Sequence, residues 1–211
     1  MKDSFKNKEI KKYLETLYPN AKCELNYSKD YEFLIAVILS AQVSDKKVNE
    51  ITKILFSKFD SLDKLNNATY EEIFEIIKPL GLAKNKTLAI KDATNKLINE
   101  FNYKVPSNKE DLLKIKGVGN KVSNVILIEL FNKEEFPVDT HIYRFAKRLN
   151  YISYSDSILK AEKELKANFD SQDYKSLHHK IIFFGRYKCK SLSPDCKDCL
   201  IKKYCNFNKK I

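Results

Sequence analysis

Apolar residues recur along most of the chain at intervals of three and four, which is the spacing of one face of an α-helix. Near the N-terminus, for example, Ile10, Tyr13, Leu14 and Leu17 form one such face. The pattern predicts about ten helices and no convincing pair of strands, so the expected fold class is all-α. Helix starts are indicated by N-capping residues at Ser44 or Asp45, Thr69, Ser107, Asp139, and Ser155 or Asp156.

One segment departs from the amphipathic pattern. Residues 33–39 read Phe-Leu-Ile-Ala-Val-Ile-Leu without a polar interruption. The length of the surrounding run and the lack of turn residues favour a buried helix within residues 31–41. Periodicity alone leaves a core strand as the alternative.

Two of the chain's four glycines, Gly117 and Gly119, flank Val118 between two predicted helices. The first helix follows a capping-box pattern, Ser107-x-x-Glu110, and the second runs to about Phe131. Glycine is needed where a turn takes positive φ or where another group approaches the backbone closely. Backbone amides at a helix N-terminus bind anions readily. The pattern therefore indicates either a phosphate-binding turn or simply a tight corner between two helices.

Lys121 begins the second of these helices, above Val125 and Ile128 on a mostly apolar column. A lysine in this position is either a surface residue whose stem covers apolar neighbours or a partly desolvated amine beside a phosphate site. A nucleophilic lysine requires burial or cationic neighbours to depress its pKa.

Composition adds a preference for a polyanionic partner. The 211 residues carry a formal net charge of +11, and all but three of the 39 basic residues are lysine. An A+T-rich genome would also produce a surplus of lysine, so the net charge alone overstates the argument for a polyanionic partner. No apolar run is long enough to span a membrane, and residues 2–12 lack the apolar region of a signal peptide. We therefore expect a soluble, cytoplasmic protein without a membrane partner.

Four of the five cysteines lie within the last 23 residues, and the fifth, Cys23, is isolated. With no export signal, disulfides are disfavoured and a metal site is the leading interpretation. Zinc would use four thiolates tetrahedrally, and an iron–sulfur cubane also takes four. The single C-x-x-C favours the cluster, because zinc ribbons usually pair two such knuckles, but both remain open. The spacing C-x6-C-x2-C-x5-C is formed by Cys189, Cys196, Cys199 and Cys205.

Together these motifs resemble the endonuclease III family, the helix-hairpin-helix DNA glycosylases with a [4Fe-4S] loop. The resemblance rests on I-x-G-V-G-x-K at the hairpin, on Val138-Asp139-Thr140-His141 eighteen residues after Lys121, and on the cysteine spacing. It covers almost the whole chain, because Ser40-Ala41-Gln42, Gly81-Leu82 and Phe184-Gly185-Arg186-Tyr187 also look like family segments in the same order. Departures are small. The hairpin has Lys116 where the family usually has proline, Asn120 where a basic residue is common, and Val122-Ser123 in place of Thr-Ala.

The resemblance implies a two-lobed fold and a base-excision activity. One lobe is a six-helix barrel at residues 21–133, and the other combines residues 1–20 with 134–211 and the cluster, with the lesion pocket between them. The implied enzyme is a monomeric DNA glycosylase and AP lyase of the nucleoid. It would remove oxidised pyrimidines from duplex DNA after flipping the base out, and then cleave the abasic site by β-elimination.

The resemblance also implies roles for individual residues. Lys121 would attack the sugar C1′ and form a Schiff base, and Asp139 would assist and stabilise positive charge on the sugar. The cluster ligands would be Cys189, Cys196, Cys199 and Cys205, and the residues implied in DNA binding are Gly117, Val118, Gly119, Gln42, Leu82 and His141. His141 would either contact phosphate or orient the segment around Asp139.

Two other interpretations compete with this one. The mismatch-specific adenine glycosylases share the cysteine spacing, but that family lacks the hairpin lysine and carries a further C-terminal domain. A non-catalytic DNA-binding module would use the hairpin and the cysteines only as structure. The presence of Lys121 argues against the first interpretation. Lys121 together with Asp139 at the family interval argues against the second, because a pure binder would not require them.

Overall fold

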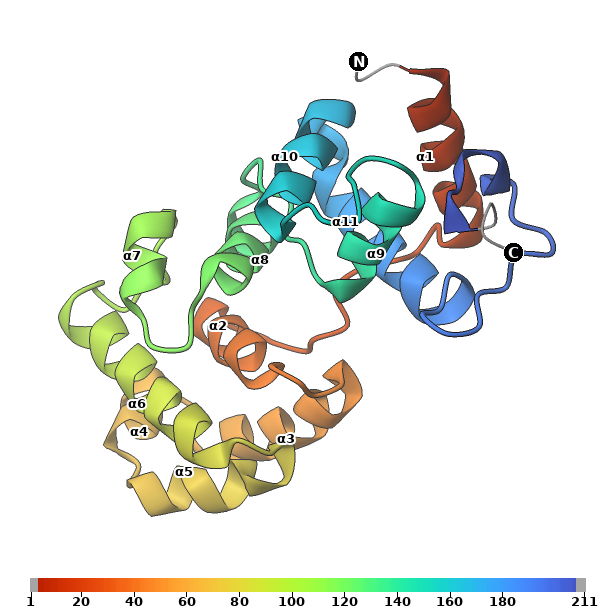
Figure 1. Cartoon of the computed structure of the whole chain (residues 1–211). Helices are drawn as coiled ribbons and strands as arrows, with labels where there is room; N and C mark the ends of the chain where they lie inside the picture. The colour runs from red at the N-terminus through yellow and green to blue at the C-terminus, as the bar shows by residue number, and fades with distance from the viewer. Residues whose placement is uncertain (1–3, 208–211) are drawn as a thin grey trace. The chain divides into compact units, whose positions relative to one another are not determined.

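The computed structural model describes residues 4–207, and within this range the chain is helical and contains no strand. The all-α prediction is confirmed. The sequence pattern predicted about ten helices, and the helix that it did not predict is α4 (Leu62–Asn67), which is six residues long. The chain divides into two compact units, Glu24–Phe131 and Met1–Cys23 with Asn132–Ile211. Figure 1 follows the helices from the N-terminus to the C-terminus.

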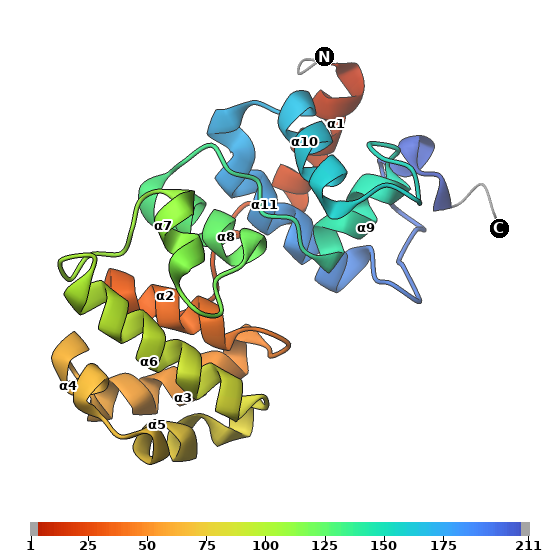
Figure 2. The ribbon, with the colours of Figure 1, turned by 60° about the vertical axis from the view of Figure 1, so that its left-hand side comes forward.

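The unit Glu24–Phe131 is built around α2 (Asp30–Leu39). Every residue of this helix from Tyr31 to Leu39 is buried, as expected for a helix surrounded by others. It packs against α3, α6 and α8, as Figure 2 shows, so the helix interpretation of residues 33–39 holds and the strand alternative is excluded. The surrounding helices are α3 (Asp45–Lys58), α4, α5 (Tyr70–Ile77), α6 (Ala83–Asn99), α7 (Lys109–Lys114) and α8 (Asn120–Phe131), with a 3-10 turn η1 (Lys78–Leu80) before α6.

The other unit packs α1 (Phe5–Leu17) against α11 (Tyr174–Phe183) and the C-terminal segment. Tyr13 donates from its hydroxyl to the carbonyl of Asp198 at 3.2 Å, and Lys203 pairs with Glu9 at 2.8 Å. These contacts join residues almost two hundred positions apart (Figure 1). The remaining elements are α9 (Thr140–Arg148), α10 (Ile158–Asn168), the 3-10 turns η2 (Ser171–Asp173) and η4 (Lys202–Tyr204), and a π-helical turn η3 (Phe184–Lys188).

The structure confirms some of the predicted helix N-caps and corrects two of them. Thr69 and Glu72 form the expected capping box. The predicted box at Ser107 is wrong, because Asn108 caps α7 by accepting from Asp111 N at 2.9 Å. Helix α10 likewise begins after Ser157, not Ser155 or Asp156. Asparagine and serine cap equally well, so neighbouring candidates compete and tertiary contacts decide between them.

No helix among the described residues is both long enough and apolar enough to cross a membrane.

Candidate functional site

The hairpin between α7 and α8 owes its turn to Gly117. This residue takes φ +85°, and a Cβ there would lie 3.1 Å from Ala89 Cβ and 3.3 Å from Ile38 Cγ2. A side chain would therefore be strained by the backbone and crowded by α6 and α2. For Gly117, a tight corner between two helices is therefore a sufficient reason for glycine.

Gly119 requires a different explanation. Its φ is ordinary, and a Cβ added to it would meet nothing within 4 Å. It occupies the N-cap position of α8, since its carbonyl accepts from Ser123 N at 2.9 Å. A glycine offers no side chain to the first-turn amides of a helix, so these amides stay available to an external acceptor. The free space and uncapped amides together suit a phosphate. The amide of Val118, by contrast, already donates to the carbonyl of Ile115 at 3.1 Å.

Lys121 lies in the first turn of α8 and its side chain is exposed. The sequence left two alternatives for Lys121, a surface residue or a partly desolvated amine, and the structure shows a surface residue. Behind it, Val125 is half-buried and Ile128 fully buried, so the helix is anchored while its first residues face outward.

Gln42 and Leu82 lie in two turns of the same unit, and both adopt the left-handed conformation although neither is glycine. Their φ angles are 61° and 52°, and Leu82 is 55% exposed. Left-handed backbone is unfavourable for residues with a Cβ and persists where the surroundings enforce it. The two turns are therefore held in place by something other than local preference.

Asp139 caps α9, as predicted: its Oδ1 accepts from Ile142 N at 2.8 Å. His141, the second residue of α9, has Nδ1 3.2 Å from Arg144 Nη2. A guanidinium can only donate, so this contact requires neutral His141 with the proton on Nε2. Burial is the main cause that lowers the pKa of His141, and the charge of Asp139 opposes it. Gly185 lies directly against this ring, since a Cβ there would come within 2.7 Å of His141 Cβ.

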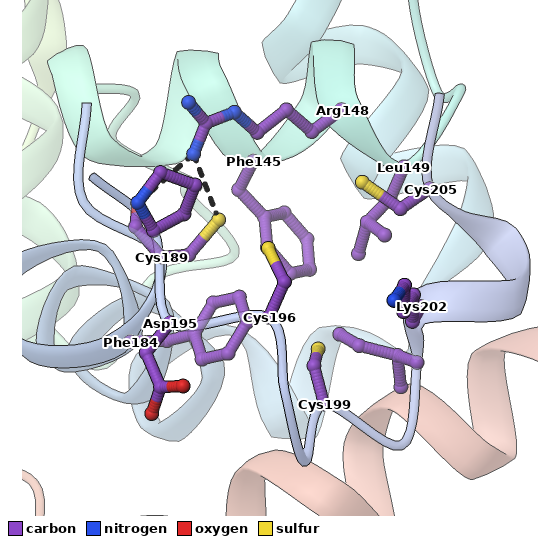
Figure 3. A pocket seen from close by; sticks show the side chains of 12 residues that line it. Phe145, Arg148, Leu149, Phe184, Cys189, Asp195, Cys196, Cys199, Lys202 and Cys205 are labelled. Carbon is purple, nitrogen blue, oxygen red and sulfur yellow. Dashed lines mark hydrogen bonds between the residues drawn. The ribbon is translucent and has the colours of Figure 1, made fainter. Parts of the chain in front are cut away.

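The four C-terminal cysteines surround one cavity in the second unit. Cys189, Cys196, Cys199 and Cys205 line one pocket, whose other walls include Phe145, Phe184 and Ile201. Figure 3 shows the four sulfur-bearing side chains around this space, with Cys196 between Cys189 and Cys199. Within residues 4–207, no three potential ligands come close enough together to hold a single metal ion.

Arg148 ties the first cysteine to α9. The buried guanidinium donates to Cys189 Sγ at 3.1 Å and to the carbonyls of Lys190 and Ser191 at 2.8 and 2.9 Å. Burial raises the pKa of the Cys189 thiol, and the hydrogen bond from Arg148 opposes that rise. Arg144 adds a second link, from Nε to the Cys189 carbonyl at 3.1 Å. The helix that begins at Asp139 thus also holds the start of the cysteine loop.

The structure groups the predicted residues by unit. Gln42, Leu82, the hairpin glycines and Lys121 belong to the unit Glu24–Phe131, whereas Asp139, His141 and the cysteines belong to the other. Sequence reasoning missed Arg144 and Arg148. The signal that could have found them is that arginine occurs at only three positions in a chain that otherwise uses lysine. It also missed Lys86 and Asp92, which bind backbone groups far along the chain.

Comparison with known proteins places this arrangement in one class. The family model described as HhH-GPD superfamily base excision DNA repair protein matches residues 35–171. The chain is 38% identical to endonuclease III of Bacillus subtilis over 92% of this chain and 89% of that protein, and 39% identical to the Rickettsia conorii enzyme over 90% of each. A solved non-covalent endonuclease III–DNA complex matches with a TM-score of 0.91, 36% identity and 98% coverage of both chains. A trapped covalent endonuclease III–DNA intermediate matches with a TM-score of 0.90 and 37% identity over 96% of this chain and 97% of that chain.

The all-helical fold, the hairpin and these matches define an enzyme of DNA base excision repair. The chain belongs to the HhH-GPD superfamily and, within it, to the endonuclease III family of DNA glycosylases with lyase activity.

Proposed function

We propose that this enzyme removes oxidised pyrimidines from duplex DNA and then cleaves the abasic strand by β-elimination, with Lys121 as the nucleophile. The observation that carries the proposal is the position of Lys121 in the first turn of α8, two residues after the N-cap residue Gly119. The amine is exposed in the free protein, so the burial that a nucleophilic lysine requires would come from the bound duplex. A phosphate bound at those first-turn amides would bring the adjacent sugar close to this amine. The covalent intermediate trapped in a homologous endonuclease III–DNA structure supports chemistry of this kind.

In the proposed reaction the Lys121 amine attacks C1′ of the damaged nucleotide, and the glycosidic bond breaks as the base leaves with its electron pair and gains a proton. Loss of the amine proton and opening of the sugar give a protonated Schiff base. Removal of a C2′ proton then expels the 3′ phosphate and breaks the strand. The oxidised base must first leave the stack, because its C1′ bond is shielded inside a duplex.

Asp139 is proposed to stabilise the positive charge that develops on the sugar as the base departs. One of its oxygens caps α9, which fixes the side chain. Among residues 4–207, no donor binds the second oxygen, so it remains available to the substrate. The N-capping role and the catalytic role are therefore compatible in one carboxylate.

The cysteine cavity is proposed to hold a [4Fe-4S] cluster through Cys189, Cys196, Cys199 and Cys205. The four thiols face a common space, yet no three converge on one ion position. A cubane gives each thiolate its own iron, so it suits this spread better than one tetrahedral zinc. When bound, the cluster would cross-link the loop, and Arg148 would stabilise the thiolate of Cys189 through its N–H donor.

The remaining proposals concern organisation. Residues 21–133 would form the six-helix domain that carries Lys121, and residues 1–20 with 134–211 the cluster domain that carries Asp139. All the proposed chemistry uses one chain, so a monomer is sufficient. Its partner would be duplex DNA, contacted at Gly117–Gly119, Gln42, Leu82 and His141, which implies work on the nucleoid in the cytoplasm.

A product assay tests the proposed function. A duplex with one thymine glycol should release the free base and leave a strand ending in a 3′ unsaturated aldehyde. Matched duplexes carrying 8-oxoguanine or no lesion serve as controls and should react far more slowly. An intact abasic strand as the end product would contradict the lyase step, and preference for the purine lesion would contradict the substrate class.

A further inference from the structure

Two exposed turns in the unit Glu24–Phe131 share an unusual backbone feature. Gln42, after α2, and Leu82, before α6, both adopt left-handed φ without being glycine. The local backbone hydrogen bonds of these turns run from Val43 N to Ser40 O at 3.1 Å, from Gly81 N to Lys78 O at 3.3 Å and from Lys86 N to Leu82 O at 3.1 Å. None of these bonds joins one turn to the other, so a further restraint is required to fix the distance between the two strained residues.

The restraint is Lys86, one turn into α6. Its side chain is 4% exposed, and its Nζ donates to the carbonyl of Ala41 at 3.0 Å and to the carbonyl of Leu80 at 3.1 Å. Within residues 4–207 it pairs with no carboxylate, so its acceptors are backbone carbonyls. A buried amine of this kind is unfavourable unless hydrogen bonds offset its loss of water.

The two carbonyls lie next to the strained residues. Ala41 directly precedes Gln42, and Leu80 is separated from Leu82 by Gly81 alone. The hydrogen bond to Ala41 orients the peptide plane that precedes Gln42. The hydrogen bond to Leu80 orients the plane that precedes Gly81, which also has positive φ and is joined to Leu82. One ammonium group therefore fixes both backbones and the distance between them.

We propose that Lys86 is a positioning residue for base extrusion: it sets the spacing of Gln42 and Leu82, which in the proposed function contact the duplex beside the flipped nucleotide. This inference rests on the proposed function and deepens it. Lys86 touches neither phosphate nor the reacting sugar. It governs how well the enzyme holds a base out of the stack, and leaves general DNA affinity and the lyase step to the hairpin and Lys121.

Lys86→Met tests the proposal, because methionine keeps most of the length and apolar stem but has no donor. Lys84→Met is the matched control, since Lys84 lies in the same helix with the same charge and is exposed. Three quantities are measured: the Kd for undamaged duplex, the single-turnover rate of thymine glycol excision, and the fluorescence of 2-aminopurine beside an abasic-site analogue. The last reports unstacking without requiring chemistry.

We expect Lys86→Met to slow excision by at least tenfold and to reduce the fluorescence rise, while its Kd for undamaged duplex stays within twofold of wild type. Lys84→Met should match wild type in excision and fluorescence. Unchanged excision in Lys86→Met overturns the inference, and so does a parallel loss of excision and undamaged-duplex binding, which would indicate a general structural role.

If Lys86→Met does not accumulate as folded protein, Lys86→Gln replaces it, because the shorter glutamine side chain does not reach both carbonyls and should therefore slow excision while binding of undamaged duplex is kept. A Lys86→Gln enzyme as fast as wild type would overturn the inference. Failure of the proposed function is distinguishable: wild-type protein would then neither excise nor unstack, whereas failure of this inference alone leaves wild type active and Lys86→Met equal to it.

Discussion

The backbone amide of Lys116 donates to Asp92 Oδ2 at 2.7 Å, so a carboxylate of α6 holds the start of the hairpin turn. Asp92 also pairs with Lys96 at 3.2 Å, and Lys96 in turn donates to the carbonyl of Lys114. Proline, which the family usually has at the position of Lys116, has no N–H and a fixed φ. In this chain a hydrogen bond from the Lys116 amide to Asp92 of α6 thus restrains the backbone where a proline ring would otherwise do so.

A double-mutant cycle tests that replacement. Asp92→Ala should weaken duplex binding about tenfold to a hundredfold, as expected for losing a hydrogen bond to a charged group, which contributes roughly 1.5–3 kcal/mol. In a Lys116→Pro background the same change should have little effect, because the donor is already gone. Ile115 has φ −80° and ψ 129°, the extended backbone that a following proline requires. Asp111→Ala controls for the loss of a negative charge. If Asp92→Ala weakened duplex binding equally in both backgrounds, the hydrogen bond between Lys116 and Asp92 would not be what holds the hairpin.

The two hairpin glycines should respond differently to substitution. Gly119→Val has open space for its side chain, so the fold should survive while binding to damaged and undamaged duplex weakens alike. The dependence of Kd on salt should also become shallower, because fewer phosphates are contacted. Gly117→Ala should instead lower the free energy of unfolding by roughly 1 kcal/mol or more, because left-handed backbone is unfavourable for alanine. Normal binding of intact duplex by Gly119→Val would rule out the phosphate role.

Iron content tests the cysteine site. The purified protein should be brown and hold about four irons per chain. Arg148→Met should lower the iron-to-protein ratio, because it removes the donor to Cys189 Sγ and to two loop carbonyls. Lys190→Met removes an equal charge from an exposed neighbour and should keep full iron. Colourless protein with one zinc would eliminate the cluster.

His141 should make stability depend on pH. Its pKa in the folded state is lowered from 6.5, chiefly by burial, so the unfolded chain takes up this proton first as pH falls. The stability contributed by neutral His141 is complete above about pH 6.5 and is lost as pH falls toward the lower folded pKa. His141→Gln keeps an acceptor for Arg144 but cannot titrate. Thermal unfolding midpoints between pH 7.5 and 5.5 should therefore fall further for wild type than for His141→Gln, and parallel curves would exclude the effect.

The sequence predicted what depends on side-chain type and local spacing. Helix α2 was recognisable because its apolar run continues around the whole helix, and Asp139 because a capping residue stands directly before its helix. The choice of Asn108 over Ser107 was not predictable, since both residues cap well and differ only in tertiary fit.

Lys86, Asp92 and Arg148 escaped prediction for another reason. Their acceptors or donors are mainly backbone groups 45, 24 and about 42 positions away, respectively. A backbone carbonyl or amide is present at almost every residue, so such contacts leave no signature in the sequence. Only the folded chain shows which backbone group a buried lysine or arginine reaches.

Asp139→Asn separates the two proposed chemical steps. Asparagine keeps an N-capping oxygen, so α9 and the fold should survive. Base excision should fall by orders of magnitude because the carboxylate charge is lost. Cleavage of a preformed abasic site should suffer less, since no glycosidic bond remains to be broken. Equal losses in both assays would contradict the assigned role of Asp139.

Borohydride trapping on duplex DNA with an abasic site tests the central claim most directly, because reduction converts a Schiff base into a permanent bond. Wild-type protein should become covalently attached, and peptide mapping should place the link at Lys121. Lys121→Gln preserves a polar side chain but cannot form an iminium, so it should bind DNA and give neither trapping nor strand cleavage. A Lys121→Gln protein that is still trapped and still nicks abasic DNA would show that another amine performs the chemistry.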